Sequence, residues 1–446
     1  MKRSLLLLPF LGLLLAFGLP LPAVAELLRP DMTGVVKNSN GEPVPGAVAF
    51  IFAAGPRKGS SPLCTYSYPD CGKRSVADAG GNFRIESLDP ALDFYLLVMA
   101  PGYGPFSKWS ILPEAGPVGV KLNPRDLAKL SPASHVQGRI LGPDGRPVAG
   151  ATFDLEGQER GDTTSWGGAD TDAMAISDAN GEFHIAGPKP FTAVHVVIEK
   201  QGLAKRWARL EPGKTLLLRM SQGVSVKGRL VFKGQPLRNV KLGIGTVERQ
   251  CGVYLKGFHT TTDEEGRFVF DNIPSGMKYL VFTQMDSAGK SGAYLRHEFD
   301  LGKDGAPLDL GELQAQPTHR IAGRVVLTDG KSLPPQTRIL LDIPGSWDFS
   351  LIPLDAEGRF EVTGVPAERV AISFHPDGYR FSTKNPSIGT QQRGINGRLT
   401  GDLPDFNILL EPGKPPGYEE IERLSYEEQQ KRADMPLQGG TLNAGN

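Results

Sequence analysis

Apolar and polar positions alternate most clearly in residues 138–155, which read GRILGPDGRPVAGATFDL. Two short apolar runs, one around Ile140 and one around Phe153, flank the segment GPDGRP. Asp-Gly favours a tight turn because glycine adopts positive φ at little cost, and the prolines cannot continue a helix. The pattern therefore predicts a strand, a turn and a second strand.

Three other blocks of the chain open with the same pattern. Aligned on the first glycine, the four copies begin at Gly34, Gly138, Gly228 and Gly323. In each copy an Asp and a Gly then precede an aromatic strand, which carries Phe83, Phe183, Phe268 or Phe360. An apolar run that ends in turn residues and a short closing strand follow. Landmarks repeated in one order indicate an internal repeat of roughly 95 residues.

Each repeat has room for about seven short strands with a turn every 8 to 12 residues, which is typical of a two-sheet sandwich. We therefore predict an all-β protein of four tandem antiparallel β-sandwich modules of the immunoglobulin or transthyretin-like kind. Because the linkers are short, we expect an elongated rod or a gently curved array, with each core completed within its own copy. The predicted segments are a leader at 1–25, sandwiches at 26–130, 131–222, 223–316 and 317–412, and a charged tail at 413–446 that forms a short helix or stays disordered.

Composition and charge support this picture and exclude some partners. The 446 residues include 55 Gly and 37 Pro, which favours turns over long helices. Lys plus Arg equals Asp plus Glu at 49 each, so no net field is available to attract nucleic acid. We expect no nucleic-acid partner.

The N-terminus predicts export. Lys2 and Arg3 precede an apolar run of about 15 residues, and Ala23-Val24-Ala25 follows two prolines. The run is shorter than the roughly 20 residues that span a bilayer, so we predict a cleaved signal peptide and no membrane span after cleavage. The product is expected in a periplasm or outside the cell.

Export makes disulfide formation possible. Cys64 and Cys71 lie in the loop sequence SPLCTYSYPDC, and we predict that they pair in an oxidising compartment. Free thiols remain the alternative. Cys251 is then left as a single thiol.

Several segments together resemble a known domain family. They are the opening motif at 138–148, the segment SDANGEF at 177–183, and the apolar strand that ends in Gly-Tyr at 378–379. They resemble the carboxypeptidase regulatory-like domain, a transthyretin-like β-sandwich of the carbohydrate-binding-like fold group, over about residues 32–412. The resemblance implies a non-catalytic accessory module found in tandem on secreted and envelope proteins, and it names no ligand.

No catalytic, cofactor-binding or metal-binding residues are expected. None of the seven histidines has a Glu at the third position after it, as a zinc peptidase site requires, and neither a P-loop nor G-x-S-x-G is present. We therefore predict that the protein is not an enzyme. His184 and His195 are expected to be ordinary strand residues.

Two weaker candidate sites come from loop positions. Asp170, Asp172 and Asp178 offer oxygen ligands that calcium prefers, although capping of turns is the simpler interpretation. The tryptophans sit in or beside predicted loops, where an exposed indole can stack on a sugar ring, although a tryptophan is often buried at the end of a sandwich. The candidate glycan contacts are Trp109, Trp166, Trp207 and Trp347.

The sequence leaves three functional interpretations open. The first is a structural or protein-binding rod at the cell envelope, and the second is a carbohydrate-binding protein that uses loop aromatics. The third is an accessory subunit of a separately encoded enzyme. The expected partner is thus a protein or a glycan at the cell envelope.

Overall fold

The computed structural model describes most of the chain downstream of the expected leader. The described residues are 29–58, 61, 63–166, 170–249, 254–302, 306–334, 337–346, 348–374, 378–382, 384–385, 394–414, 431 and 433–442. The expected signal peptide, Cys251 and Trp347 lie outside them. Among the described residues, no helix has the length and apolar character needed to cross a bilayer.

Two sheets form each of the first two sandwiches. Module 1 pairs the sheet β4-β1-β7 with the sheet β3-β2-β5-β6. Its strands are β1 (Met32–Asn38), β2 (Val48–Pro56), β3 (Arg74–Val76), β4 (Asn82–Ile85), β5 (Leu92–Met99), β6 (Phe106–Ile111) and β7 (Val118–Leu122). Module 2 pairs β12-β8-β15 with β10-β9-β13-β14, and β11 adds to β9. Its strands are β8 (His135–Leu141), β9 (Thr152–Arg160), β10 (Thr163–Trp166), β11 (Met174–Ile176), β12 (Glu182–Ala186), β13 (Ala193–Glu199), β14 (Arg206–Leu210) and β15 (Thr215–Arg219).

The last two sandwiches repeat this plan. Module 3 consists of two sheets. The first has the strand order β17-β16-β20, and β24 pairs with β16. The second has the order β19-β18-β21-β23. Its elements are β16 (Val224–Phe232), β17 (Gln235–Pro236), β18 (Lys241–Thr246), β19 (Phe258–Thr261), β20 (Arg267–Ile273), β21 (Met277–Thr283), helix α1 (Met285–Ser291), β22 (Ala293–Tyr294), β23 (Arg296–Leu301) and β24 (Leu308–Gln314). Module 4 also consists of two sheets. The first has the strand order β22-β25-β32-β30, and β28 pairs with β25. The second has the order β27-β26-β29-β31. Its own strands are β25 (Gln316–Leu327), β26 (Arg338–Ile343), β27 (Asp348–Pro353), β28 (Arg359–Pro366), β29 (Arg369–Ser373), β30 (Tyr379–Phe381), β31 (Gly394–Arg398) and β32 (Ile408–Pro412). The predicted all-β fold of four sandwich modules is confirmed.

The two sequence landmarks of every repeat lie opposite each other in the first sheet. The directly paired residues are Gly34 and Phe83, Gly138 and Phe183, Gly228 and Phe268, and Gly323 and Phe360. A Cβ atom at Gly138 would lie 2.9 Å from Cζ of Phe183. The glycine therefore leaves room for the buried aromatic ring, which explains why the two landmarks recur together.

The Asp of the second landmark builds the turn that precedes the aromatic strand. Asp178 Oδ1 accepts hydrogen bonds from the backbone N–H groups of Asn180 (2.9 Å) and Glu182 (2.7 Å). Gly181 completes this turn with a φ of 74°. The equivalent turns begin at Asp78, Asp263 and Asp355 and have the same two backbone contacts.

The closing strand of each module departs from a purely antiparallel sandwich. β7, β15, β24 and β32 run parallel to the opening strands β1, β8, β16 and β25. The remaining strand pairs of the described residues are antiparallel. Each closing strand returns from the opposite sheet by a crossover, which is the connection that parallel neighbours require.

Modules 3 and 4 share a core, which corrects the expectation that each core is complete within its own copy. Helix α1 occupies the segment that the sequence pattern predicts as turn, and its Met285 and Ala288 are buried in the core of module 4. Tyr294 of β22 belongs to the same core, and β22 pairs with β25 of module 4. Residues 285–294 therefore lie within the sequence of module 3, between β21 and β23, but complete module 4.

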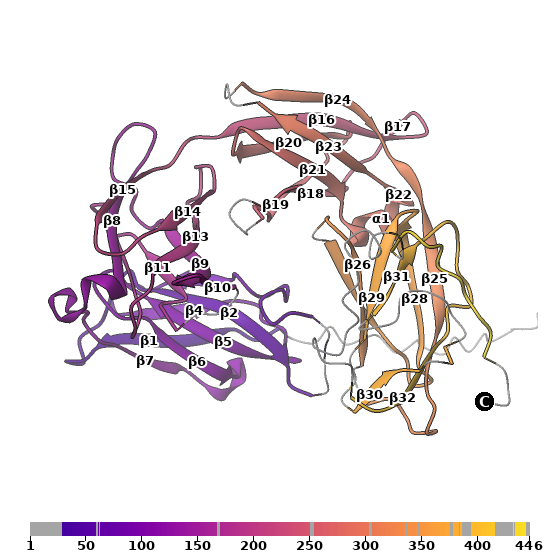
Figure 1. Ribbon diagram of the computed structural model, residues 1–446, viewed down its shortest axis with the longest axis horizontal. Coiled ribbons are helices and arrows are strands. Elements are labelled where there is room, and N and C mark those ends of the chain that lie inside the picture. The colour runs from indigo at the N-terminus through magenta and orange to yellow at the C-terminus, as the bar shows by residue number, and fades with distance from the viewer. Residues whose placement is uncertain are drawn as a thin grey trace, which may run out of the picture.

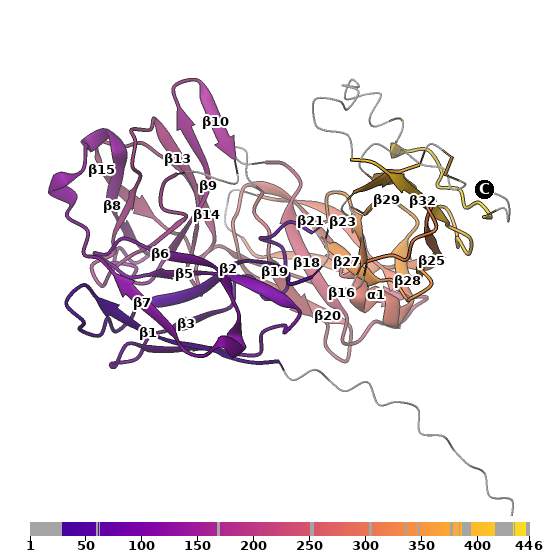
Figure 2. The ribbon, with the colours of Figure 1, turned by 90° about the horizontal axis from the view of Figure 1, so that it is seen from below.

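The modules close on one another and do not form the expected elongated rod or gently curved array. Figure 1 shows the four modules following one another around a common centre, and Figure 2 shows the same molecule turned by 90°. Leu340, Phe349 and Leu351 of module 4 pack against the core of module 1. The reason is that outward sheet faces also carry apolar side chains, as where Leu97 and Met174 join modules 1 and 2. Burying these faces draws the modules together.

The described part of the tail contacts module 4. Leu437 is 3% exposed and belongs to the module 4 core. Isolated bridges join Arg398 to Pro436 and Phe406 to Gly440. Most of the segment predicted as a charged helix lies outside the described residues.

Candidate functional site: the chamber between the modules

A cavity of about 710 Å³ lies where the four modules meet, and we call it the chamber. Each module contributes to its wall, for example through Tyr66, Asp154, His259 and Asp342 of modules 1 to 4. The volume lies in the range typical of small-molecule sites. The ring closure described above therefore creates a site that no single module contains.

Module 2 contributes acidic residues from its outward sheet face. Asp154 and Glu156 lie on β9 and both line the chamber, and Glu199 lies on the neighbouring strand β13. Lys205 pairs with Glu199 at 2.7 Å, and its Nζ donates to the carbonyl oxygen of Lys256 at 2.9 Å. Asp154 has no hydrogen bond or ion pair within the described residues.

Burial controls the charge of Asp154. Its pKa is raised to about 7, first by desolvation and then by the nearby carboxyl groups of Glu156 and Glu199, against the opposing effect of Lys205 and Lys256. The residue is partly buried, and it lines the chamber. Asp154 therefore holds its proton to a much higher pH than an exposed aspartate does.

Module 4 contributes two further carboxyl groups. Asp342 lies on β26, and its Oδ1 is buried without a hydrogen-bond partner among the described residues. Burial raises the pKa of Asp342 to about 6. Asp348 begins β27, and its Oδ2 accepts a hydrogen bond of 2.7 Å from Met285 N at the start of α1. Burial raises the pKa of Asp348 to about 7, but this group already has a structural partner.

Module 3 contributes basic groups to the chamber. Lys256 and His259 line it from the segment that leads into β19 and from β19 itself. Burial, followed by the charge of Lys205, lowers the pKa of His259. The imidazole is therefore neutral at neutral pH, and it lies 3.2 Å from Gln284 Nε2 through its Nδ1.

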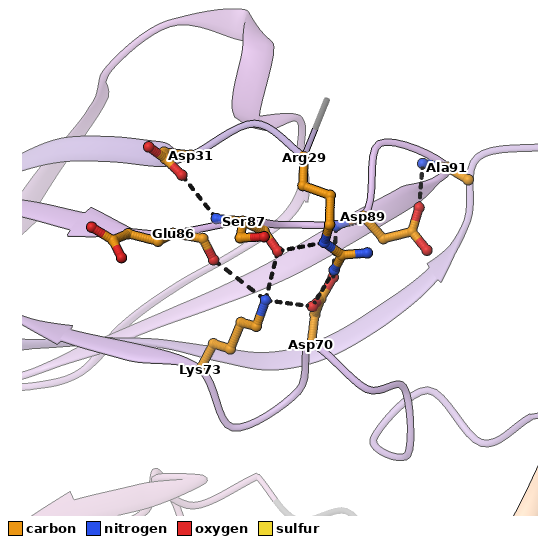
Figure 3. A network of polar contacts seen from close by, with 8 residues as sticks. All are labelled: Arg29, Asp31, Asp70, Lys73, Glu86, Ser87, Asp89 and Ala91. Atoms are coloured by element: carbon orange, nitrogen blue, oxygen red, sulfur yellow. Dashed lines mark hydrogen bonds and ion pairs between the residues drawn. The ribbon is translucent and has the colours of Figure 1, made fainter. Parts of the chain in front are cut away.

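Module 1 closes the chamber with the loop that joins β2 to β3. Asp70, which is 1% exposed, anchors this loop. Figure 3 shows Arg29 and Lys73 converging on it, with Arg29 Nη2 at 2.7 and 2.9 Å from its two oxygens and Lys73 Nζ at 2.8 Å. Asp89 N donates to Asp70 Oδ2 at 2.7 Å. This network of ion pairs and hydrogen bonds positions the part of the loop that bears Tyr68.

A row of aromatic rings leads away from the chamber over module 1, and we call it the aromatic strip. Tyr66, which lines the chamber, lies 5.2 Å from Phe52 between ring centroids. Phe52 lies 5.7 Å from Tyr95, which stacks on Trp109 at 4.7 Å. Tyr66 is 48% exposed and Trp109 is 46% exposed. Of these aromatic residues, only Trp109 was identified from the sequence. The alternation of Phe50 and Phe52 in β2 indicates an outward-facing aromatic surface and could have predicted the rest.

The predicted tryptophan sites do not form one surface. Trp109, Trp166 and Trp207 lie in strands β6, β10 and β14 rather than in loops. Trp166 is 48% exposed and lies 4.9 Å from the His195 ring. Trp207 is half-buried beside Leu255, at the contact between modules 2 and 3. Trp109 is therefore the member that continues the aromatic strip.

Cys64 and Cys71 both line the chamber. They are free thiols in the structure, and their pairing on oxidation stays a prediction. Cys71 Sγ donates to the Thr65 carbonyl oxygen at 3.3 Å, and burial raises the pKa of Cys71 to about 11. A thiol of that pKa is a poor nucleophile at neutral pH.

The three aspartates considered for calcium have other partners. Asp170 pairs with Arg160, Asp172 accepts from Arg125 Nη2 at 2.8 Å, and Asp178 forms the turn described above. Within the described residues, no cluster of three His, Cys, Asp or Glu side chains is arranged to hold a metal ion.

Comparison with known proteins leaves the family open. No protein-family model matches the chain, and no curated protein matches it by sequence. Among solved structures, a streptococcal ancillary pilin has 13% identity and a TM-score of 0.24, covering 64% of this chain and 99% of its own. The Bacillus anthracis TIE protein has 11% identity and a TM-score of 0.18, covering 86% and 73%. A variant of the major pilin subunit of Bacillus cereus has 10% identity and a TM-score of 0.15, covering 64% and 99%. At these TM-scores, none of the likenesses supports an argument about family or function.

Proposed function

We propose that the chain is an exported, non-catalytic protein that binds a ligand at the centre of its four modules. It acts as a compact binding scaffold at the cell envelope or outside the cell. The predicted leader supports export, and the resemblance to carboxypeptidase regulatory-like domains supports a non-catalytic role. The raised pKa of Cys71 agrees with that role because it leaves the thiol unactivated.

One observation carries the proposal: module 4 packs against module 1, and the chamber takes its walls from all four modules. Modules that served only as spacers would not need to bury Leu340 and Phe349 against the first module. Ring closure and a chamber of ligand size arise from the same contacts. A binding role at this place therefore explains the arrangement.

The test is a thermal-shift screen of the purified full chain against a library of amines, acids, sugars and short peptides. Ser67 lines the chamber, so Ser67→Trp fills part of it. Thr164→Trp adds the same bulk at an exposed position of β10 and is the matched control. We expect ligands that stabilise the wild type and Thr164→Trp but not Ser67→Trp. Ligands that stabilise Ser67→Trp equally, or a library without any stabilising member, would contradict the proposal.

A second candidate function is glycan binding on the aromatic strip. It is favoured by the exposed Trp109 ring, which Tyr95 holds by stacking at 4.7 Å. A flat exposed indole of this kind can stack on the apolar face of a sugar. Polysaccharide binding that is lost in Trp109→Ala and kept in Trp166→Ala would support it, and equal binding by both variants would exclude it.

A further inference from the structure

The walls of the chamber carry more acid than base. Its carboxyl groups are Asp154, Glu156 and Glu199 from module 2, and Asp342 and Asp348 from module 4. The opposing cations are Lys205 and Lys256, and His259 is neutral. Lys205 is already paired with Glu199, and Asp348 is already bonded to helix α1. The excess of negative charge therefore falls on Asp154, Glu156 and Asp342.

Two of these carboxyl groups are partly withdrawn from water and present oxygens without a partner within the described residues. Asp154 is partly buried and has no hydrogen bond or ion pair within the described residues. Asp342 Oδ1 is buried and unbonded within the same part of the chain. A carboxylate that is withdrawn from water without a compensating donor is destabilising. Residues of two different modules thus present acceptors without donors to one cavity.

The aromatic ring at the chamber wall indicates what kind of donor fits. Tyr66 lines the cavity, is 48% exposed and begins the aromatic strip. An aromatic face attracts organic cations, and ammonium and guanidinium groups also donate several hydrogen bonds to carboxylates. A bare metal ion fits less well, because the described residues contain no cluster with metal-ligand spacing.

We propose that the chamber binds an ammonium or guanidinium group carried on a flexible chain, with Asp154 and Asp342 as its acceptors and Tyr66 beside it. This proposal rests on the chamber being the binding site proposed above. The cavity of about 710 Å³ is far larger than one ammonium group, so part of the attached chain enters with it. The aromatic strip offers the rest of the ligand an apolar surface that leads out of the chamber.

The experiment is calorimetric titration of the purified full chain at neutral pH. The probes are 1,5-diaminopentane and the peptide acetyl-Gly-Lys-Gly-amide, with 1,5-pentanediol and glutarate as neutral and anionic controls. We expect at least one of the two cationic probes to bind, at one site per protein chain. We expect neither control compound to bind. Binding of the diamine alone indicates a free polyamine as ligand, and binding of the peptide indicates a protein side chain.

Matched variants locate the site. Asp154→Asn and Asp342→Asn keep the shape of the side chain and remove a desolvated charge, so neither is expected to unfold the protein. Each should weaken binding of the cationic probe by about tenfold or more, as expected for a lost charge-assisted hydrogen bond. Asp162→Asn, at an exposed turn outside the chamber, should leave the affinity unchanged.

Three results would overturn the inference: no binding of either cation, equal binding of the diol, or unchanged affinity in both chamber variants. These results are separable from failure of the proposed function. If uncharged or anionic library ligands still depend on the chamber in the Ser67→Trp screen, only the cationic ligand class is wrong. If no ligand depends on the chamber, both proposals fail.

Discussion

The junction between modules 3 and 4 and the contact between modules 4 and 1 bring sandwiches together by different means. At the first, helix α1 and strand β22 enter module 4, so Met285 and Tyr294 lie in its core. At the second, a loop of module 1 is held in place by the Asp70 network while apolar side chains of β26 and β27 pack against it. The first junction depends on shared core packing, and the second depends on apolar side chains that pack against a loop held by a buried charged anchor, Asp70. The two should therefore respond differently to mutation, pH and salt.

The largest effect is expected at the shared core. Met285 is 1% exposed, so Met285→Ala should lower the free energy of unfolding of module 4 by about 3 kcal/mol through lost burial and a residual cavity. Chemical denaturation followed by fluorescence and by hydrogen exchange measures this loss and assigns it to a module. Met435→Ala is the control, because Met435 is 52% exposed and should change stability little. A destabilisation confined to module 3 would show that the helix does not belong to the module 4 core.

The next effect is expected at the charged anchor. Asp70→Asn keeps the size of the side chain but removes its ion pairs with Arg29 and Lys73. Because both cations keep access to water, the cost should be about 2 kcal/mol rather than that of a fully buried pair.

The global readout separates this variant from Met285→Ala. Asp70→Asn should open the contact between modules 4 and 1, which small-angle scattering detects as a larger radius of gyration, while each module stays folded. Exchange protection in residues 63–73 should fall. Asp89→Asn is a useful comparison, because Asp89 meets Asp70 through its backbone N–H, which the substitution keeps. An unchanged scattering curve for Asp70→Asn would mean that apolar packing alone holds the ring closed.

The difference between these junctions also marks what the sequence could predict. Pairing of Gly138 with Phe183 follows from local alternation and turn chemistry, so the opening sheets were predictable. Helix α1 was not, because the segment MDSAGKS has the composition of a turn and becomes helical only where module 4 covers Met285. Tertiary burial overrode local propensity there.

The chamber was unpredictable for a related reason. Asp154 and Asp342 occupy strand positions whose side chains normally face solvent. An aspartate at such a position does not indicate a cavity. The two residues line one cavity because modules that are distant in sequence pack together. Neither the periodicity of apolar residues nor the spacing of motifs in the sequence predicts that packing. The sequence placed the tryptophans in or beside loops, whereas Trp109, Trp166 and Trp207 lie in strands, and their role as glycan contacts stays a prediction.

A smaller, pH-dependent effect is expected from the chamber. Burial raises the pKa of Asp154 to about 7 and of Asp342 to about 6, above the ordinary value of 3.8. The folded state therefore binds these protons more tightly than the unfolded state. Their contribution to stability is complete at low pH and is lost as the pH rises from about 4 to about 7. Glu156, Glu199, Lys205 and Lys256 face Asp154 and set the steepness of the change.

Asparagine at both positions removes this dependence. The double variant Asp154→Asn with Asp342→Asn should be more stable than the wild type near neutral pH by about 1 kcal/mol per site, a value reduced by water in the cavity. The melting temperature measured from pH 5 to pH 8 should fall less steeply for the variant. A cationic ligand should reverse the trend in the wild type, since it favours the ionised carboxylates. Parallel curves for both proteins would show that these groups stay solvated.

The smallest effect is expected where the tail meets module 4, because there a charged contact lies on the surface. Arg369, then Arg398, lower the pKa of Asp434 to about 2 through hydrogen bonds to its carboxylate. Asp434→Asn should release residues 433–442 only partly, because Leu437 stays buried in the module 4 core. In the wild type the contribution of this ion pair is present above about pH 4 and is lost as the pH falls toward 2, opposite in sign to that of the chamber. Hydrogen exchange of the tail at low and at high salt measures it, and the difference between the two proteins should vanish in high salt because exposed pairs are screened. A difference that persists in high salt would mean that Asp434 positions the tail by geometry rather than by charge.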